Sequence, residues 1–145
     1  GIFTKMTNFE LGTRVPLIVS APGQKAVGQR TRALVELVDL YPTLAELAGL
    51  SLPAHLEGKS FVPLLANPAL PWKDAAFSQY LRPGPDRIMG RSVRTERWRY
   101  TEWKNGRGES VGVEFYDHER DPAEKENLAD APENAATIAE LARRL

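Results

Sequence analysis

Apolar and polar residues alternate through parts of the second half of the chain, as in strands with one buried face. Four strand-like segments, separated by turn-forming sequence, span residues 75–81, 88–95, 97–103 and 111–116. In the third, Trp98 and Tyr100 fall on one face and the neighbouring arginines on the other. Asn105-Gly106 is a strong turn signal, within a longer loop that reaches Ser110. The pattern predicts a small antiparallel sheet of four strands.

A helix is predicted after this sheet. Asp130 stands three residues before Glu133, and Pro132 lies between them, an arrangement typical of the first turn of a helix. The apolar positions that follow have helical spacing and are expected to face the core: Ile138, Leu141 and Leu145. The second half of the chain therefore reads as a sheet with a C-terminal helix packed against it.

The first half of the chain has a different pattern. Residues 15–20 form a short, β-branched apolar run, which predicts a strand buried in a parallel or mixed sheet. Asp39 can cap a helix that continues through Ala48 and ends at Gly49, with Pro42 tolerated in its first turn. Its predicted buried stripe consists of Leu40, Leu44, Leu47 and Ala48. Strand followed by helix indicates the tail of an α/β layer.

Prolines and weak periodicity mark residues 50–74, so we place a boundary near Pro71. Residues 1–71 are predicted to end an α/β domain, and residues 72–145 to form the antiparallel sheet and helix as a subdomain. Gly1 leads directly into structured sequence, without the charged and apolar regions of a signal peptide. We therefore expect the chain to be a piece of a longer protein.

Composition narrows the classes of protein. The chain has 145 residues, 42% of them hydrophobic and 26% charged, which is typical of a globular protein that can bury a core. Its net charge is zero, which argues against nucleic acid or a membrane surface as a partner. No apolar run approaches the roughly eighteen residues of a membrane span. Cysteine is absent, which excludes disulfides and thiolate chemistry within the chain.

Charge is unevenly distributed along the second half. Basic residues dominate 82–107, namely Arg82, Arg87, Arg91, Arg94, Arg97, Arg99, Lys104 and Arg107. Acidic residues dominate 109–140. The favoured interpretation is that the two segments pair with each other across the surface, and a basic rim around an anionic substrate is the alternative.

Local motifs give no reaction. Gly58-Lys59-Ser60 resembles part of a phosphate-binding loop, but Pro53 stands where that motif needs glycine. His55 and His118 are too far apart for a metal pair, so a structural or exposed role is expected for each. An alternating acidic set lacks the glycine and distal glutamate of a calcium loop: Asp117, Glu119 and Asp121. No nucleophile has a base partner at local spacing. The residues alone indicate an α/β fragment followed by a sheet.

Segments in order along nearly the whole chain match one known family. They are residues 1–18, 37–44, 56–60, 77–80, 88–90, 92–95, 98–103 and 115–117. Together they resemble the C-terminal part of type I sulfatases like iduronate-2-sulfatase, members of the alkaline phosphatase-like superfamily. The resemblance implies the tail of an α/β/α sandwich followed by a four-stranded antiparallel sheet with a helix.

The family hydrolyses sulfate esters with a formylglycine made from cysteine and a calcium ion held by upstream aspartates. The resemblance therefore implies that both cofactors come from residues outside this chain, that it holds no metal, and that it is inactive alone. It implies as partners the remainder of the catalytic domain and a sulfated carbohydrate, and a periplasmic or secreted location.

Lys5 matches the lysine that in this family contacts the sulfate group and the leaving oxygen. An ammonium there stabilises charge that develops on that oxygen. Arg82, Arg87 and Lys104 lie in loops and are candidates for binding an anionic sugar. Arg94, in a matched segment, is interpreted first as a structural ion-pair residue.

Two other functions stay open. The first is a phosphate or phosphonate monoester hydrolase of the same superfamily, because the residues that set this preference lie upstream. The second is a non-catalytic carbohydrate-binding module, in which aromatic residues stack on sugars: Trp98, Tyr100 and Trp103.

Overall fold

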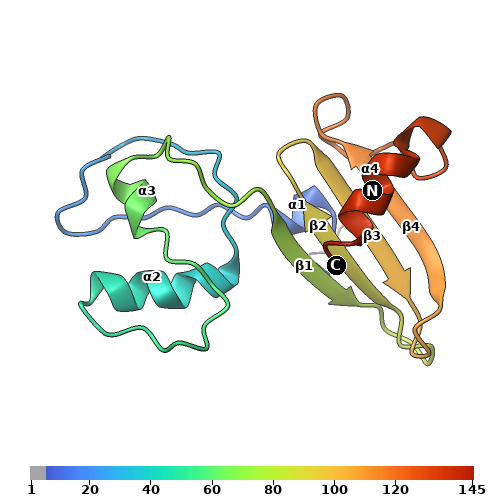
Figure 1. Ribbon diagram of the computed structural model, residues 1–145, viewed down its shortest axis with the longest axis horizontal. Helices are drawn as coiled ribbons and strands as arrows, with labels where there is room; N and C mark the ends of the chain where they lie inside the picture. Colours follow the sequence, from blue (N-terminus) through green and yellow to red (C-terminus); the bar gives the residue numbers. More distant parts are fainter. Residues whose placement is uncertain (1–5) are drawn as a thin grey trace. The chain divides into compact units, whose positions relative to one another are not determined.

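The computed structural model describes residues 6–145. The chain divides into two compact units, one made of Gly1–Pro16 with Phe77–Leu145 and the other of Leu17–Ala76. The first unit holds the sheet, and the second holds short helices and loops (Figure 1). The placement of a domain boundary near Pro71 concerns the longer protein and stays a prediction. No helix in the described part of the chain is long and apolar enough to cross a membrane.

The predicted four-stranded antiparallel sheet is confirmed. Its strands are β1 (Ala76–Leu81), β2 (Met89–Arg94), β3 (Trp98–Lys104) and β4 (Ser110–Asp117), in the order β1-β2-β3-β4. β2 pairs antiparallel with β3, and β3 with β4, with a register shift at Trp103 and Lys104. Sequential strands are joined directly, through residues 82–88, 95–97 and 105–109, as antiparallel neighbours can be.

One face of the sheet carries the apolar core. Val93 and Phe115 are fully buried there and Tyr100 is 3% exposed, since the three lie opposite one another in the register. Trp98 stacks on Phe115 with a centroid distance of 4.9 Å. The helix α4 (Ala135–Ala142) lies in front of this face and buries Leu141 (Figure 1). It begins later than predicted, because a 3-10 turn, η2 (Pro132–Asn134), occupies the proposed first turn.

The other face is polar and is covered by α1 (Glu10–Thr13) (Figure 1). Thr101 donates a hydrogen bond to Ser92 at 2.9 Å, and both side chains are buried. At the far end of this face, the ring of Trp103 lies against Gly90, where any side chain would collide with it. Position 90 therefore requires glycine, because the Trp103 ring lies too close to leave room for a Cβ.

Gly90→Ala is expected to destabilise the protein by about 1–3 kcal/mol, the usual cost of overpacking a close-packed site. A Cβ at position 90 would lie 2.4 Å from the Trp103 ring, which is 4% exposed and covered by Arg82 and so has little room to move. Gly112→Ala is the matched control, because a Cβ there would be 3.8 Å from the same ring. Urea unfolding measures both, and equal losses would contradict the prediction.

The second unit is organised around a buried carboxylate. Asp39, with no exposed surface, ends η1 (Leu37–Asp39) and precedes α2 (Leu40–Leu47). It accepts hydrogen bonds from the backbone N–H groups of Glu36 and Lys59, each at 2.8 Å, and pairs with Lys73 at 2.6 Å. Thr43 links α2 to Phe61, next to α3 (Val62–Ala66). The predicted helix is confirmed to within one residue.

Two predictions for the first half of the chain are wrong. Residues 15–20 form no strand, and Ile18 is 91% exposed, because no described segment pairs with their backbone. The predicted stripe of α2 is not buried: Leu44 is 65% and Leu47 40% exposed. The helix instead buries Thr43 and Ala45, because the hydroxyl of Thr43 bonds to the loop that carries Phe61.

Candidate functional site

Residues 8–10 follow Lys5 closely and are anchored on the polar face of the sheet. Lys5 itself lies outside the described residues. Asn8 is 2% exposed and donates a hydrogen bond to the carbonyl of Gly90 at 3.0 Å, while its amide oxygen accepts one from Ser78 at 3.4 Å. Phe9 packs against Tyr116 with a centroid distance of 5.8 Å. The side chains of Asn8 and Phe9 therefore contact β1, β2 and β4, which lie far away in sequence.

Glu10 enters a buried network of charged side chains beneath α1. Its carboxylate accepts hydrogen bonds from Arg99 at 2.6 Å and from Arg94 at 3.1 Å. The interpretation of Arg94 as a structural ion-pair residue is confirmed by this contact. Arg99 is only 2% exposed and also donates to Glu124 at 2.5 Å. One arginine of β3 thus joins two carboxylates from opposite ends of the described chain.

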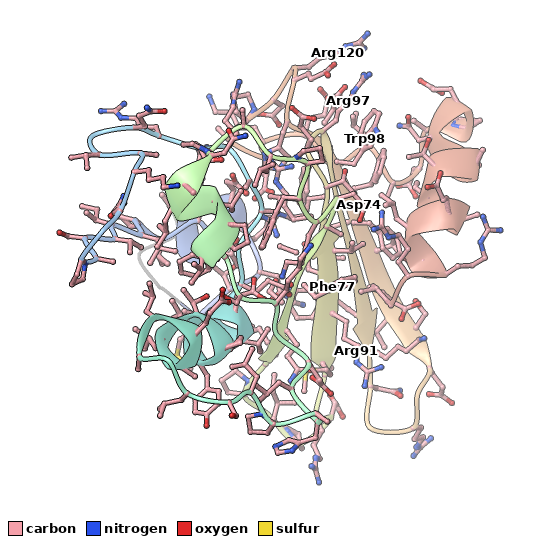
Figure 2. The ribbon with its side chains drawn as sticks, turned by 60° about the vertical axis from the view of Figure 1, so that its left-hand side comes forward. Asp74, Phe77, Arg91, Arg97, Trp98 and Arg120 are labelled. Carbon is pink, nitrogen blue, oxygen red and sulfur yellow. The ribbon has the colours of Figure 1, made fainter. Side chains whose placement is uncertain are left out.

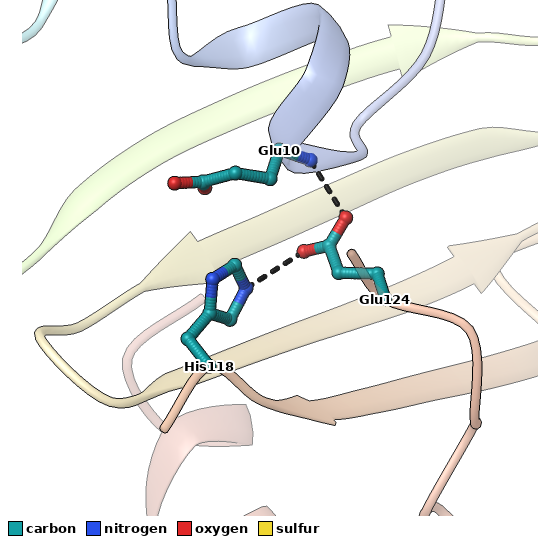
Figure 3. A group of neighbouring side chains, drawn as sticks. All are labelled: Glu10, His118 and Glu124. Carbon is teal, nitrogen blue, oxygen red and sulfur yellow. Dashed lines mark hydrogen bonds and ion pairs between the residues drawn. The ribbon is translucent and has the colours of Figure 1, made fainter. Parts of the chain in front are cut away.

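Glu124 closes the network from the turn after β4 (Figure 3). One of its oxygens accepts the backbone N–H of Glu10 at 2.6 Å, and the other lies 2.8 Å from Nε2 of His118. His118, with a side chain 5% exposed, has the structural role expected for it. Glu124 also has a left-handed backbone, with φ at 53°, which is uncommon for a residue with a Cβ.

Burial alone would raise the pKa of Glu10, but the guanidinium groups of Arg94 and Arg99 outweigh it and hold that pKa below its ordinary value. Burial also opposes ionisation of Glu124, and the contacts with His118, Arg99 and the backbone of Glu10 again lower its pKa. Both carboxylates are therefore charged and held by cations and N–H donors at neutral pH.

These two pKa shifts predict a loss of stability in acid. The unfolded state takes up protons at a higher pH than the folded state, so the stabilisation is complete above the ordinary glutamate pKa and is lost as pH falls through the lowered folded values. The free energy of unfolding, measured from pH 7 downwards, should fall less steeply for Glu10→Gln. Glu96→Gln, at an exposed position in a turn, is the control and should keep the parent profile.

Glu10, His118 and Glu124 also have the spacing of a metal site, with ligand atoms within 4.8 Å of one another. Their charges do not fit one. Two arginines already neutralise both carboxylates at hydrogen-bond distance, and a cation placed among them would meet two guanidinium groups. We therefore interpret the cluster as an ion-pair network that fastens α1 to the sheet.

The three candidate substrate-binding residues lie at the other end of the sheet, where the 82–88 and 105–109 loops meet. The N–H of Gly106 donates to the carbonyl of Asp86 at 2.9 Å and joins the two loops. Arg82 lies over the ring of Trp103 at 3.6 Å, and Lys104 pairs with Glu102 at 2.7 Å. Arg87 is exposed, with a left-handed φ of 48°. The structure brings these cations to one end of the sheet but gives two of them partners of their own.

A hollow of about 280 Å³ lies beside these loops. It is lined by Met89, Arg91, Glu102, Lys104, Asn105, Gly106 and Gly108. Arg91 is exposed at this end of the sheet, whereas Arg97, Trp98 and Arg120 lie at the opposite end (Figure 2). A role for Arg82, Arg87 and Lys104 in binding substrate stays a prediction.

The favoured interpretation of pairing between the basic and acidic segments is confirmed in part, for Arg82, Arg97 and Arg99. Arg94 and Lys104 instead pair with Glu10 and Glu102. Arg97 forms ion pairs with Asp117 at 2.7 Å and Glu119 at 3.2 Å, and Arg82 lies 3.9 Å from Glu114. The carboxylate of Asp121 is occupied too, because it accepts backbone N–H groups of the following turn. The acidic set in this segment is therefore engaged in structural contacts.

The interpretation of the aromatic residues as a sugar-binding platform is wrong. Tyr100 and Trp103 are 3% and 4% exposed. Trp98 is partly buried, and its ring contacts Phe115 and the guanidinium of Arg97. Buried rings cannot stack on a carbohydrate. Both faces of the sheet are covered, so Tyr100 and Trp103 are buried although they point to opposite faces of β3.

Comparisons with known proteins identify the family of this chain. The family model described as "N-sulphoglucosamine sulphohydrolase, C-terminal" matches residues 1–145. Arylsulfatase K of Mus musculus is 33% identical over 138 residues, which cover 88% of this chain and 24% of that protein. Delta 4,5-hexuronate-2-O-sulfatase of Bacteroides thetaiotaomicron is 34% identical over 137 residues, 88% of this chain and 27% of that protein. The chain thus spans about a quarter of the length of these relatives.

Solved structures share the fold. One, in complex with its substrate D-glucosamine-2-N,6-O-disulfate, matches with a TM-score of 0.62 and 28% identity over 74% of this chain and 22% of its own. The phosphonate monoester hydrolase of Agrobacterium radiobacter matches with a TM-score of 0.59 and 27% identity over 73% of this chain and 23% of its own.

Proposed function

Because this chain belongs to the family of N-sulphoglucosamine sulphohydrolase C-terminal domains, we propose that it is the C-terminal part of a sulfatase that hydrolyses sulfate esters of sugars. The observation that carries the proposal is the match of the family over the whole chain. The four-stranded sheet with its helix, shared with solved members of the superfamily, is consistent with it.

Sulfated sugars are the proposed substrates for two reasons. One relative of this chain is named for a sulfate on a hexuronate, and one structural neighbour was solved with a disulfated glucosamine. Such substrates are anionic, and the cations at one end of the sheet suit them: Arg82, Arg87 and Lys104. The family resemblance also leads us to expect an enzyme of the periplasm or of the extracellular space.

In this proposal Lys5 is the catalytic residue of the chain, and its ammonium stabilises the charge on the leaving oxygen. The formylglycine nucleophile and calcium of the family would come from elsewhere in the longer protein. This chain has no cysteine, and the one metal-like cluster of its described residues is already neutralised by arginines. We therefore expect the 145-residue chain alone to be inactive.

The remainder of the catalytic domain is the proposed partner of the exposed apolar surface of the second unit. Several large apolar side chains of η1 and α2 are exposed there: Leu37, Val38, Tyr41, Leu44 and Leu47. A surface of this kind marks an interface. The chain produced alone is expected to aggregate or to bind the separately produced remainder, as measured by light scattering and by co-elution. A monodisperse monomer that ignores the remainder would contradict this.

The test of the proposed function is hydrolysis by the full-length protein of 4-nitrophenyl sulfate, 4-nitrophenyl phosphate and phenyl phosphonate esters, followed by sulfated disaccharides. Preference for the sulfate ester supports the proposal. The second candidate is a phosphonate or phosphate monoester hydrolase, which the similarity to the Agrobacterium radiobacter enzyme favours. Faster hydrolysis of the phosphate or phosphonate esters would favour this second candidate instead.

A further inference from the structure

The hollow near the loops of the sheet lies on the core face, beyond the part of that face that is covered. Arg91 and Val93 point to the same face of β2, because they are two residues apart in one strand. Val93 is fully buried, whereas Arg91 is exposed (Figure 2). The cover of this face therefore ends between the two residues, and the hollow of about 280 Å³ has Arg91 in its lining.

The 105–109 loop lines the hollow and is fixed by its own hydrogen bonds. The side-chain oxygen of Asn105 accepts the N–H groups of Arg107 and Glu109, each at 3.0 Å. The N–H of Gly108 donates to the carbonyl of Asn105 at 2.9 Å. Gly106 and Gly108 line the hollow without side chains that could fill it. This wall is therefore formed before any ligand binds, as is usual in ligand sites.

An arginine without an ion pair lies in this hollow. Arg91 stands opposite Glu102 in the register of β2 and β3, but Glu102 pairs with Lys104 at 2.7 Å instead. Within the part of the chain that the structure describes, the guanidinium of Arg91 has no ion pair or hydrogen bond. The side chains of Lys104 and Glu102 are 43% and 20% exposed, so a ligand can reach both. Two cations thus line the hollow against one carboxylate.

We propose that this hollow binds one anionic unit of a sulfated carbohydrate. The planar fork of the Arg91 guanidinium suits the oxygens of a sulfate or a carboxylate, and the Lys104 ammonium adds a second positive charge. The carboxylate of Glu102 can accept hydrogen bonds from sugar hydroxyl groups, and Met89 offers an apolar surface to the ring.

The size of the hollow favours a single sugar unit. Its volume is just below the roughly 300 Å³ at which pockets for drug-sized ligands begin. The choice of a sugar as ligand rests on the proposed function, whereas the choice of an anion rests on the charges of the lining alone.

The test is methionine NMR of the full-length protein, because Met89 lines the hollow. In protein labelled with carbon-13 at the methionine methyl groups, the Met89 signal is identified by its loss in Met89→Leu. Titration with a chondroitin sulfate tetrasaccharide is expected to shift that signal until it saturates. A chitin tetrasaccharide, which is neutral, should leave the signal where it is.

Arg91→Gln is expected to weaken this binding about tenfold, because it removes roughly one charge-assisted hydrogen bond. Arg91 is exposed, so the substitution should leave the fold intact. Arg107→Gln is the matched control, since it removes the same charge from the neighbouring loop and Arg107 does not line the hollow. Its binding constant should stay within about twofold of the parent's, because solvent and salt screen a charge outside the site.

A hyaluronan tetrasaccharide identifies the group that is bound, because it carries carboxylates and no sulfate. Binding as tight as that of chondroitin sulfate would support the site with a carboxylate as the recognised group. Weaker binding than that of chondroitin sulfate would support it with a sulfate in that place.

Three results would overturn the site and leave the sulfatase activity untouched. They are a Met89 signal that neither acidic sugar moves, an equal shift with the neutral tetrasaccharide, and equal weakening by Arg91→Gln and Arg107→Gln. A full-length protein that hydrolyses no sulfate ester would instead refute the proposed function. The titration needs no turnover, so it would still decide whether the hollow binds an anionic sugar.

Discussion

Replacing Lys5 by alanine in the full-length protein is expected to lower kcat/KM for an aryl sulfate by roughly 100-fold or more. The reason is the loss of a positive charge beside an oxygen that becomes negative in the transition state, where water replaces a preorganised ammonium poorly. The effect should appear mainly in kcat, because the interaction strengthens as the bond to the leaving group breaks.

Lys25→Ala is the matched control, since Lys25 is an exposed lysine in a loop of the second unit. It should keep the parent's rate. Equal rates for the parent and Lys5→Ala would leave the family membership in place and remove Lys5 from the site.

Arg99→Ala is expected to lower the free energy of unfolding by about 3–5 kcal/mol, the usual result of removing one partner from a buried ion pair. The substitution leaves the carboxylates of Glu10 and Glu124 buried without their shared cation. Much of the loss is the cost of leaving Glu124 buried without an arginine, whereas Glu10 keeps its ion pair with Arg94. Denaturant unfolding with unchanged m-value measures it.

Arg97→Ala is the matched control, two residues earlier beside the same strand. Its side chain is 37% exposed, so water reaches the ion pairs that it forms. Its partner Glu119 is 64% exposed, and Asp117, which is buried, also accepts the backbone N–H of Glu119. Solvent screening makes such pairs weak, so its loss should be much smaller than that of Arg99→Ala. Equal losses would show that burial does not distinguish the two arginines.

The two changes test different properties of the same unit. Lys5→Ala should lower activity and leave stability near that of the parent, because a lysine that contacts substrate contributes little to packing. Arg99→Ala should lower stability, and activity only as far as the folded fraction falls. The pair therefore separates the group that is proposed to act on the substrate from the network that fastens α1 to the sheet.

Much of the second half could be predicted from sequence because its signals are local. β1 alternates between partly buried and exposed positions over its six residues, and Asn105-Gly106 turns the chain between β3 and β4. The oxygen of the Asn105 side chain accepts the N–H groups of Arg107 and Glu109, each at 3.0 Å, which explains the longer loop. A pattern that involves only near neighbours survives in any tertiary context that buries one face.

The apolar segments of the first half were predicted wrongly for the opposite reason. Residues 15–20 have the composition of a buried strand, but strand pairing needs a second segment, and no described residue offers one. Leu44 and Leu47 likewise have the spacing of a buried stripe and remain exposed. Hydrophobicity identifies side chains that favour burial and cannot say which surface covers them.

The charged network shows what sequence reasoning missed. Arg99 was assigned to the polar face of its strand, which is correct, but that face is covered and the arginine is buried. Its partners lie 89 residues before it and 25 residues after it, a separation at which no spacing rule applies. The one available signal was the excess of arginine in a segment whose acidic counterpart lies further along the chain.

The sequence by itself determined the strands, their turns, the C-terminal helix and the family, because these depend on local alternation and on ordered matches along the chain. Only the tertiary structure decided that Glu10, Arg94, Arg99, His118 and Glu124 meet under α1. The physical reason is that a buried charge is tolerated only where folding brings its partners to hydrogen-bond distance, and that distance is a property of the packed sheet.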